Sequence, residues 1–170
     1  MSDAIELTGV THRFTGAAAA ALEDVSAAIP AGQITGLVGP DGAGKTTLMR
    51  LMAGLLRASA GTLQVGGLDP VSAGDELRAL LGYMPQKFGL YDDLTVLENL
   101  ELYADLRRVV GPERAASFAR LLAFTDLGPF TDRHAGKLSG GMKQKLGLAC
   151  VLLGCLCNLL TAYVWPESWI

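Results

Sequence analysis

Residues 39–48 read "GPDGAGKTTL", and the order of their glycines, lysine and threonines is the most informative pattern in the chain. Gly39, Gly44, Lys45 and Thr46 fit the pattern G-x-x-x-x-G-K-[ST]. Glycines let backbone N–H groups turn toward an anion without a side-chain clash, and a helix that begins there aims its positive end at the same point. The pattern predicts a phosphate-binding loop. The competing interpretation is a glycine turn that opens an ordinary helix.

Each residue type of this loop has a distinct use in holding a nucleotide. A lysine ammonium reaches the terminal phosphates as a point charge, and a threonine hydroxyl is a ligand for a Mg²⁺ ion that bridges phosphate oxygens. We therefore predict a nucleotide and Mg²⁺ as cofactors, although a P-loop alone does not distinguish a kinase, a GTPase or a transport ATPase. The predicted nucleotide-binding residues of the loop are Gly39, Gly42, Gly44, Lys45, Thr46 and Thr47, with Thr47 at the α-phosphate and Thr46 at the metal.

The sequence around the loop predicts strands and helices in alternation. The apolar run "ITGLV" (34–38) is typical of a buried parallel strand, and "KTTLMRLMAGLL" (45–56) has helical spacing. Further strands are expected in "IELTGVTHRF", "GTLQVGGLD" and "ALLGYMP", and helices between Leu94 and Ala123 and from Ser139 onward. Interleaved strands and helices favour an α/β architecture.

Composition limits the classes of function. The chain has 170 residues, is 50% hydrophobic and 18% charged, and carries a net charge of -3 without a run of Lys or Arg, so nucleic acid is not expected as the main partner. The first ten residues lack the pattern of a secretory signal. Three cysteines fall within residues 150–157 at a spacing unlike a zinc site, and we interpret them as buried small apolar residues in a reducing compartment.

A second glycine pair opens the stretch "LSGGMKQKLGLA" (138–149). This stretch resembles the signature sequence of the ABC ATPases, the motor subunits of ABC transporters. Ser139, Gly140 and Gly141 would open a helix with free N–H groups and a hydroxyl, which is another anion site at a helix N-terminus. The resemblance implies a head-to-tail dimer, in which this signature faces the γ-phosphate held by the partner's loop. The structural alternative is a serine N-cap with a flexible start.

The stretch "GYMPQKFGLYDDLTVLENL" (82–100) is similar to the Q-loop of the same family and the helical region after it. The resemblance implies that Gln86 contacts Mg²⁺ and the attacking water, and that residues 86–100 lie against the membrane subunits. Phe88, Leu90 and Tyr91 would then be apolar anchors. Phe14 stands where the family usually places an aromatic that stacks on adenine, although a core position fits it equally well.

The resemblance runs from residue 4 to about residue 154 and implies a P-loop NTPase core with a helical subdomain and an incomplete core sheet. We expect an ATP-binding core in residues 1–86 and 137–154, a helical subdomain in 87–136 and an atypical tail in 155–170. The implied function is coupling ATP binding and hydrolysis to export, in the manner of bacterial multidrug transporters. The resemblance also implies that the chain is a peripheral subunit at the cytoplasmic face of the membrane. Its implied catalytic residues are Lys45 and Gln86.

The tail departs from the family. An apolar strand that ends in Asp-Glu-Pro should follow the signature helix, and a histidine later, but the chain continues "VLLGCLCNLLTAYVWPESWI". Glu167 lacks a preceding Asp, so it is not assigned as the general base. A frameshift or truncation, a membrane-spanning segment from Leu146 to Trp165, and a genuine module that binds ATP without turnover remain open.

Two other functions also remain open. One is an ABC ATPase that acts in DNA repair or translation rather than transport. The other is a regulatory or vestigial module that only binds ATP. Exposure of the apolar residues between 86 and 100 would favour the transport role, because a membrane subunit needs a surface to contact.

Overall fold

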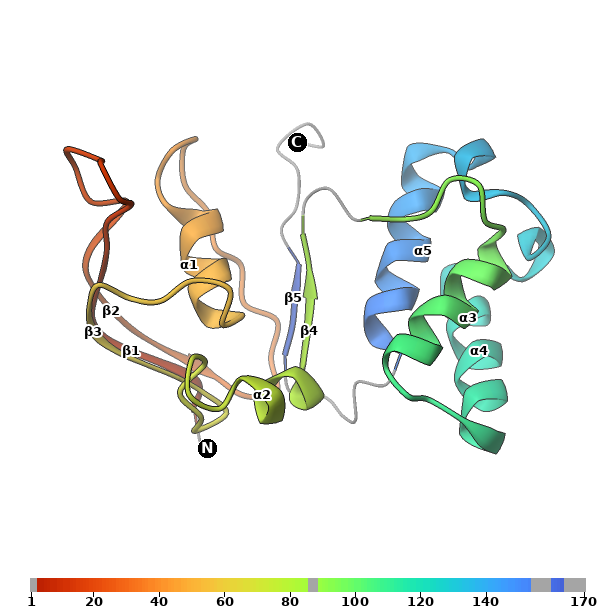
Figure 1. The fold of residues 1–170 in the computed structure, drawn as a ribbon, viewed down its shortest axis with the longest axis horizontal. Coiled ribbons are helices and arrows are strands. Elements are labelled where there is room, and N and C mark those ends of the chain that lie inside the picture. Colours follow the sequence, from red (N-terminus) through yellow and green to blue (C-terminus); the bar gives the residue numbers. More distant parts are fainter. Residues whose placement is uncertain (1–2, 86–88, 154–159, 164–170) are drawn as a thin grey trace. The chain divides into compact units, whose positions relative to one another are not determined.

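The computed structural model describes residues 3–85, 89–153 and 160–163 (Figure 1). These residues form two compact units, and each is described by itself. The first contains the described residues up to Leu81 together with the strand β5 (Leu160–Tyr163). The second contains the described residues from Gly82 to Leu153.

The first unit is built on a three-stranded antiparallel sheet. Its strands lie in the order β2-β1-β3, with Ile5 opposite both Ile29 and Val65. Alternate apolar residues of the central strand, among them Ile5 and Leu7, are buried on one face, as a half-buried strand requires. The strands are β1 (Asp3–His12), β2 (Leu22–Pro30) and β3 (Ala60–Val65), which confirms the strands predicted at "IELTGVTHRF" and "GTLQVGGLD".

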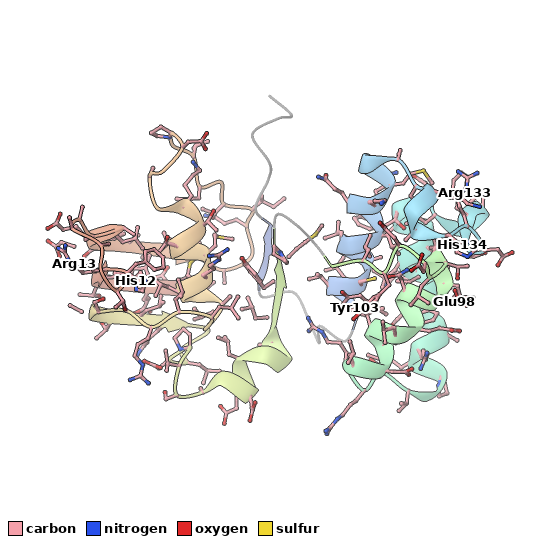
Figure 2. All side chains as sticks on the ribbon, turned by 45° about the horizontal axis from the view of Figure 1, so that its top comes forward. His12, Arg13, Glu98, Tyr103, Arg133 and His134 are labelled. Atoms are coloured by element: carbon pink, nitrogen blue, oxygen red, sulfur yellow. The ribbon has the colours of Figure 1, made fainter. Side chains whose placement is uncertain are left out.

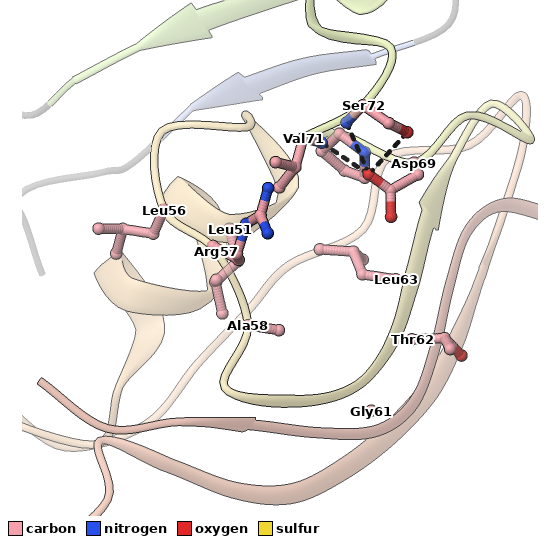
Figure 3. Close-up of a pocket in the computed structure, with 11 residues that line it drawn as sticks. Leu51, Leu56, Arg57, Ala58, Gly61, Thr62, Leu63, Asp69, Val71 and Ser72 are labelled. Atoms are coloured by element: carbon pink, nitrogen blue, oxygen red, sulfur yellow. Dashed lines mark hydrogen bonds between the residues drawn. The ribbon is translucent and has the colours of Figure 1, made fainter.

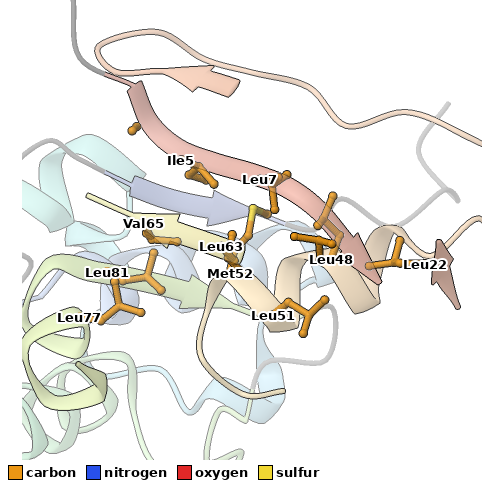
Figure 4. Packing of buried hydrophobic residues seen from close by; sticks show 12 residues of the cluster. Ile5, Leu7, Leu22, Leu48, Leu51, Met52, Leu63, Val65, Leu77 and Leu81 are labelled. Carbon is orange, nitrogen blue, oxygen red and sulfur yellow. The ribbon is translucent and has the colours of Figure 1, made fainter. Parts of the chain in front are cut away.

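Helix α1 (Lys45–Met52) belongs to the same core as this sheet. Its apolar stripe of Leu48, Leu51 and Met52 is buried in one cluster with Leu7 and Leu63 from the strands (Figure 4). Burying three large apolar side chains stabilises this docking by several kcal/mol, at about 1.5–3 kcal/mol for each. The C-terminal half of the helix is therefore anchored in the core, and its first turn is held next to the loop that precedes it. This confirms the helix predicted from Lys45.

The strand predicted at residues 34–38 is absent from the described structure. Residues 34–40 have no regular secondary structure, and Ile34, Leu37 and Val38 are exposed. A buried parallel strand needs a hydrogen-bonded neighbour on both sides. Within residues 3–85, 89–153 and 160–163, no strand pairs with this run, so the apolar pattern alone does not produce a ladder. The prediction of a buried strand here was wrong for this chain.

Two further elements lie near the point in the sequence where the two units divide. Strand β4 (Leu81–Met84) confirms the short strand predicted at "ALLGYMP". Helix α2 (Gly74–Leu80) was not predicted. It begins with Asp75 and Glu76 in its first turn, where acidic side chains favour a helix N-terminus, and Leu77 anchors it in the core. This acidic pair is the sequence signal for the start of α2.

The second unit is helical. Its helices share one buried core that includes Val96, Leu100, Leu121, Leu146 and Cys150. Burial raises the pKa of the Cys150 thiol to about 12, which agrees with its interpretation as a small apolar residue. The elements are α3 (Val96–Leu106), α4 (Gly111–Thr125) with Pro112 in its first turn, the 3-10 turns η1 (Gly128–Phe130) and η2 (Ala135–Lys137), and α5 (Gly140–Leu152).

The entrance to α3 is fixed by two polar devices. Thr95 and Glu98 form a reciprocal capping box, in which the Thr95 hydroxyl accepts from the Glu98 N–H and the Glu98 carboxylate accepts from the Thr95 N–H. The bond from the Thr95 N–H lowers the pKa of Glu98. Asn99 is fully buried, donates to the carbonyls of Tyr91, Leu94 and Thr95, and accepts from the Tyr91 N–H at 3.0 Å. The loop before α3 is thus bound to the helix that follows it.

The end of α5 bears on the interpretation of the tail. The helix stops at Leu152, and Cys155, Cys157 and Glu167 lie outside the described residues. In the part of the chain that the structure describes, no helix has the length and apolar character needed to cross a membrane.

Two leucines of α3 test this account of the helical core. Leu100 is fully buried and Leu106, near the end of the same helix, is 68% exposed. We expect Leu100→Ala to lower the free energy of unfolding by about 2–5 kcal/mol, because it leaves a cavity, and Leu106→Ala to change it by no more than about 0.5 kcal/mol. Urea denaturation followed by circular dichroism measures both. Equal losses would contradict the assigned packing.

Candidate nucleotide-binding site

The loop from Gly39 to Lys45 is closed by its own lysine. The Lys45 Nζ donates to the Gly39 carbonyl at 2.6 Å and to the Pro40 carbonyl at 2.8 Å. The Ala43 N–H donates to the Pro40 carbonyl at 3.2 Å and tightens the turn. The loop thus curls around the ammonium, and a positive charge lies on its backbone. That arrangement suits an anion that takes the place of the carbonyl partners.

Gly44 is the residue where the loop becomes a helix. It is the N-cap of α1 in a left-handed conformation with φ 86°, and its carbonyl accepts from the Leu48 N–H at 2.9 Å. A Cβ at this position would lie 2.5 Å from the Ala21 carbonyl oxygen and 2.7 Å from a methyl group of Leu22. Only glycine satisfies both the conformation and the close approach. Gly42 has φ 78° but open space around it.

The first turn of α1 has neither a side-chain cap nor an acidic residue. The positive end of the helix dipole therefore meets no carboxylate from this turn, in contrast to α3, where Glu98 fills that role. Thr46 and Thr47 lie half-buried in this turn. The pattern G-K-[ST] assigns the metal to the hydroxyl of Thr46, and the roles of Thr46 and Thr47 stay predictions.

Phe14 follows strand β1, and its exposure bears on the core position that the sequence left open, while stacking on adenine stays a prediction. The side chain is 43% exposed, so it is not a core residue. Its ring meets the His12 ring edge to face, with centroids 4.6 Å apart and planes at 87°. The loop after Phe14 ends at Ala21 and Leu22, which are the residues that touch Gly44. The aromatic and the phosphate loop therefore belong to one connected part of the first unit.

The signature stretch begins α5 in the second unit. Ser139 is the N-cap, and its Oγ accepts from the Met142 N–H at 3.3 Å. Ser139 and Gly140 are exposed, Gly141 is half-buried, and the first turn contains no acidic residue. The structural alternative of a serine N-cap is thus realised. The same geometry leaves exposed N–H groups at a helix N-terminus, which is the chemistry of an anion site.

The loop at residues 91–95 is tied to the signature helix. The Lys143 ammonium contacts the Asp92 carboxylate at 2.8 Å, and the Gly136 N–H donates to the Asp92 carbonyl at 2.9 Å. Glu98, Arg133 and His134 gather at the start of α3 (Figure 2). Tyr91 is exposed and Leu90 half-buried. Gln86 and Phe88 lie outside the described residues, so their predicted roles stay predictions.

A pocket of about 340 Å³ lies beside α1, and no residue of the loop 39–46 lines it (Figure 3). Asp69 stands at its edge and accepts from the Val71 and Ser72 N–H groups. These bonds, first that from Ser72, lower the pKa of Asp69. The carboxylate thus caps the turn that leads into α2 by accepting hydrogen bonds from backbone N–H groups. Among the described residues, no cluster of three or more His, Cys, Asp or Glu side chains could hold a metal ion.

A glycine-rich loop closed by a lysine at an uncapped helix start defines a P-loop fold, and solved structures agree. The structure titled "Structure of ATP binding subunit of ABC transporter" superimposes with a TM-score of 0.76 at 28% identity, over 88% of this chain and 62% of that one. "Dimeric structure of a post-hydrolysis state of the ATP-binding cassette MJ0796 bound to ADP and Pi" gives 0.75 at 27% identity, over 88% and 69%. The predicted fold class of an ABC-type P-loop core with a helical part is confirmed.

The family model described as "ABC transporter" matches residues 22–160, and the chain belongs to this family. It is 63% identical over 155 residues to the "Probable multidrug ABC transporter ATP-binding protein YbhF" of Escherichia coli (strain K12), covering 91% of this chain and 27% of that protein. It is 39% identical to the "Sulfate/thiosulfate import ATP-binding protein CysA" of Burkholderia mallei, covering 78% and 39%. The chain thus spans well under half the length of these relatives.

Two glycines of the loop provide a matched test of its geometry. Gly44→Ala and Gly42→Ala both place alanine at positive φ, which costs about 1–2 kcal/mol. Only the Gly44 substitution also drives a Cβ into the Ala21 carbonyl. We expect it to lower the free energy of unfolding clearly more than Gly42→Ala does, measured by urea denaturation of both variants. Equal free energies of unfolding for the two variants would mean that Gly44 does not pack against residues 21 and 22.

Proposed function

We propose that this chain binds Mg-ATP and is the ATP-binding part of an ABC transporter of the multidrug-export type. The supporting observation is the loop itself, which combines an ammonium bound on backbone carbonyls with a helix start that lacks a cap and lacks acidic residues. A triphosphate supplies the negative charge that this arrangement favours. The relative from Escherichia coli is named as a multidrug transporter protein, which supports export over import.

Each residue of the loop has a part in the proposed complex. The Lys45 ammonium exchanges carbonyl contacts for oxygens of the β- and γ-phosphates, and the loop N–H groups hold the phosphates between them. Thr46 and Gln86 would hold Mg²⁺, which when bound neutralises charge on the phosphate oxygens. Thr47 contacts the α-phosphate, and Phe14 stacks on the base. The phosphate-binding glycines are Gly39, Gly42 and Gly44.

The signature at Ser139, Gly140 and Gly141 serves a second copy of an ATP-binding subunit in this proposal. Its exposed helix N-terminus has the chemistry to contact the γ-phosphate of ATP bound to the partner's loop. The solved structure titled as a dimeric post-hydrolysis state supports a dimer for the fold. Each ATP is then enclosed by residues of two chains, so closure of the dimer depends on ATP.

The proposed contact with the membrane subunits uses residues 86–100, at the cytoplasmic face of the membrane. Tyr91 is exposed at the start of the loop 91–95. Asn99 donates to the Tyr91 carbonyl, and Asp92 connects the loop to α5 through Lys143. An exposed aromatic on an ordered loop is a suitable anchor for a partner. This surface favours transport over a role in DNA repair or translation, and we place the chain there as a peripheral subunit.

The proposal assigns ATP binding to this chain, and hydrolysis needs a general base in addition. No Asp-Glu-Pro follows the signature helix in its sequence, and no general base is assigned. We propose that the purified 170-residue chain binds ATP with little steady-state turnover. A regulatory or vestigial module that only binds ATP is the second candidate, and contact with membrane subunits separates the two.

Lys45→Ala tests the proposed ATP site. Removing the ammonium should weaken Mg-ATP binding by about tenfold to a hundredfold, since a hydrogen bond to a charged group contributes about 1.5–3 kcal/mol. Lys145→Ala is the matched control, because Lys145 pairs with Asp126 on the surface of the helical unit. Calorimetric titration measures the affinities. Unchanged binding in the Lys45 variant refutes the site, and robust turnover that depends on Lys45 refutes the expected lack of hydrolysis.

Tyr91→Asp tests the proposed membrane contact. The chain is expressed together with the membrane subunits of its transporter, and the fraction recovered with membranes is measured. A carboxylate at the centre of an apolar contact should reduce that fraction severalfold. Phe124→Asp, at an exposed aromatic of α4 outside the 86–100 surface, is the control and should have no effect. Equal recovery of both variants would move the contact elsewhere.

A further inference from the structure

His12 is a buried polar residue that the nucleotide site described so far does not use. It is the last residue of β1 and is 7% exposed (Figure 2). Its Nδ1 lies 2.9 Å from the Arg57 carbonyl oxygen. Because a carbonyl can only accept, Nδ1 carries the proton and donates. Among the described residues, the buried Nε2 has no hydrogen-bond partner.

That unpartnered nitrogen argues against a purely structural role. Burying a polar atom without a partner costs free energy, and an apolar side chain of similar size would avoid that cost. What histidine provides, and leucine does not, is a flat ring that is anchored through Nδ1 to the backbone. The ring is used: it meets Phe14 edge to face at 4.6 Å, within the range in which aromatic pairs attract each other.

The backbone around this ring pair is closed on itself. The Ala21 N–H donates to the His12 carbonyl at 2.8 Å, the Ala17 N–H donates to the Phe14 carbonyl at 3.0 Å, and the Arg13 N–H donates to the Ser59 Oγ at 3.1 Å. The loop that leaves the sheet after His12 therefore returns to it at Ala21, beside Gly44. The same hydrogen-bonded backbone segment therefore positions the exposed ring of Phe14 and contacts the phosphate loop at Gly44.

We propose that His12 is a positioning residue for the base of the nucleotide: it fixes the ring of Phe14 in the orientation in which that ring stacks on the base. The inference rests on the proposed ATP site, since it gives Phe14 its ligand. An exposed phenylalanine on a loop has several side-chain rotamers, and stacking requires one of them. The His12 ring restricts that choice before ATP arrives, so less conformational freedom is lost on binding.

The inference separates the two ends of the ligand. Stacking concerns the base alone, whereas the triphosphate is held by the loop at 39–46. A change at His12 should therefore weaken the binding of ATP and leave inorganic tripolyphosphate unaffected. A general loss of structure in the first unit would weaken both.

The experiment titrates ATP and inorganic tripolyphosphate, each with Mg²⁺, into the full chain and its variants. Phe14→Ala should weaken ATP binding about fivefold to a hundredfold. His12→Leu should weaken it about twofold to tenfold. In the Phe14→Ala background, His12→Leu should have almost no further effect, because the ring that it positions is gone. The affinity for tripolyphosphate should stay within about twofold in all three variants.

His12→Phe is the variant that separates the ring from the anchor. It keeps a flat ring beside Phe14 and loses the Nδ1 donor, so its affinity for ATP should lie between those of His12→Leu and the unaltered chain. It also carries the test if His12→Leu does not fold, because it replaces the ring without leaving a cavity.

The outcomes distinguish the inference from the proposal beneath it. If the unaltered chain binds neither ATP nor tripolyphosphate, the proposed function fails. If both bind, and substitution of His12 weakens ATP equally with and without Phe14, His12 acts independently of stacking and the inference is overturned. If ATP and tripolyphosphate weaken together, the histidine is structural only. Loss confined to ATP, and dependent on Phe14, supports the inference.

Discussion

The candidate site depends on the position of the first residue of α1. The close approach of Gly44 to Ala21, at the end of the loop that follows Phe14, fixes that position. The contact is too close for a Cβ at position 44, and the left-handed backbone conformation there independently disfavours residues other than glycine. Behind it, three apolar side chains anchor the helix in the core of the sheet. The loop before it then has little freedom except to curl around the Lys45 ammonium. The shape of the candidate anion site is therefore set by the backbone at Gly44 and by the core behind α1.

The two candidate anion sites of the chain are made from the same element in different ways. At α1, glycine is the N-cap and no side chain occupies the N–H groups. At α5, the Ser139 hydroxyl already accepts from one of them. A serine cap stabilises a helix start, and its hydroxyl is able to donate to a phosphate oxygen as well as to accept from an N–H. In the proposed dimer, the uncapped start of α1 would bind the chain's own nucleotide and the serine-capped start of α5 would face that of the partner.

Local patterns predicted most of the fold. Strands β1, β3 and β4 and helices α1, α3, α4 and α5 were expected from alternation, helical spacing and turn residues, and the loop 39–46 from its motif alone. The run 34–38 failed because a buried parallel strand is defined by its neighbours, which the run itself does not encode. Helix α2 was missed because its helical signal is only seven residues long. His12 carried no motif, and only its burial beside Phe14 singled it out.

Asp92 connects segments of the helical unit that are far apart in the sequence. Its carboxylate contacts Lys143 in the first turns of α5, its carbonyl accepts from Gly136, and Asn99 clasps the residues on either side of it. The loop at 91–95 is therefore bonded at the same time to the first turns of α5 and to the turn at Gly136. The Asp92 carboxylate can move away from α5 only if its contact with Lys143 breaks, and its backbone can move away from Gly136 only if that hydrogen bond breaks.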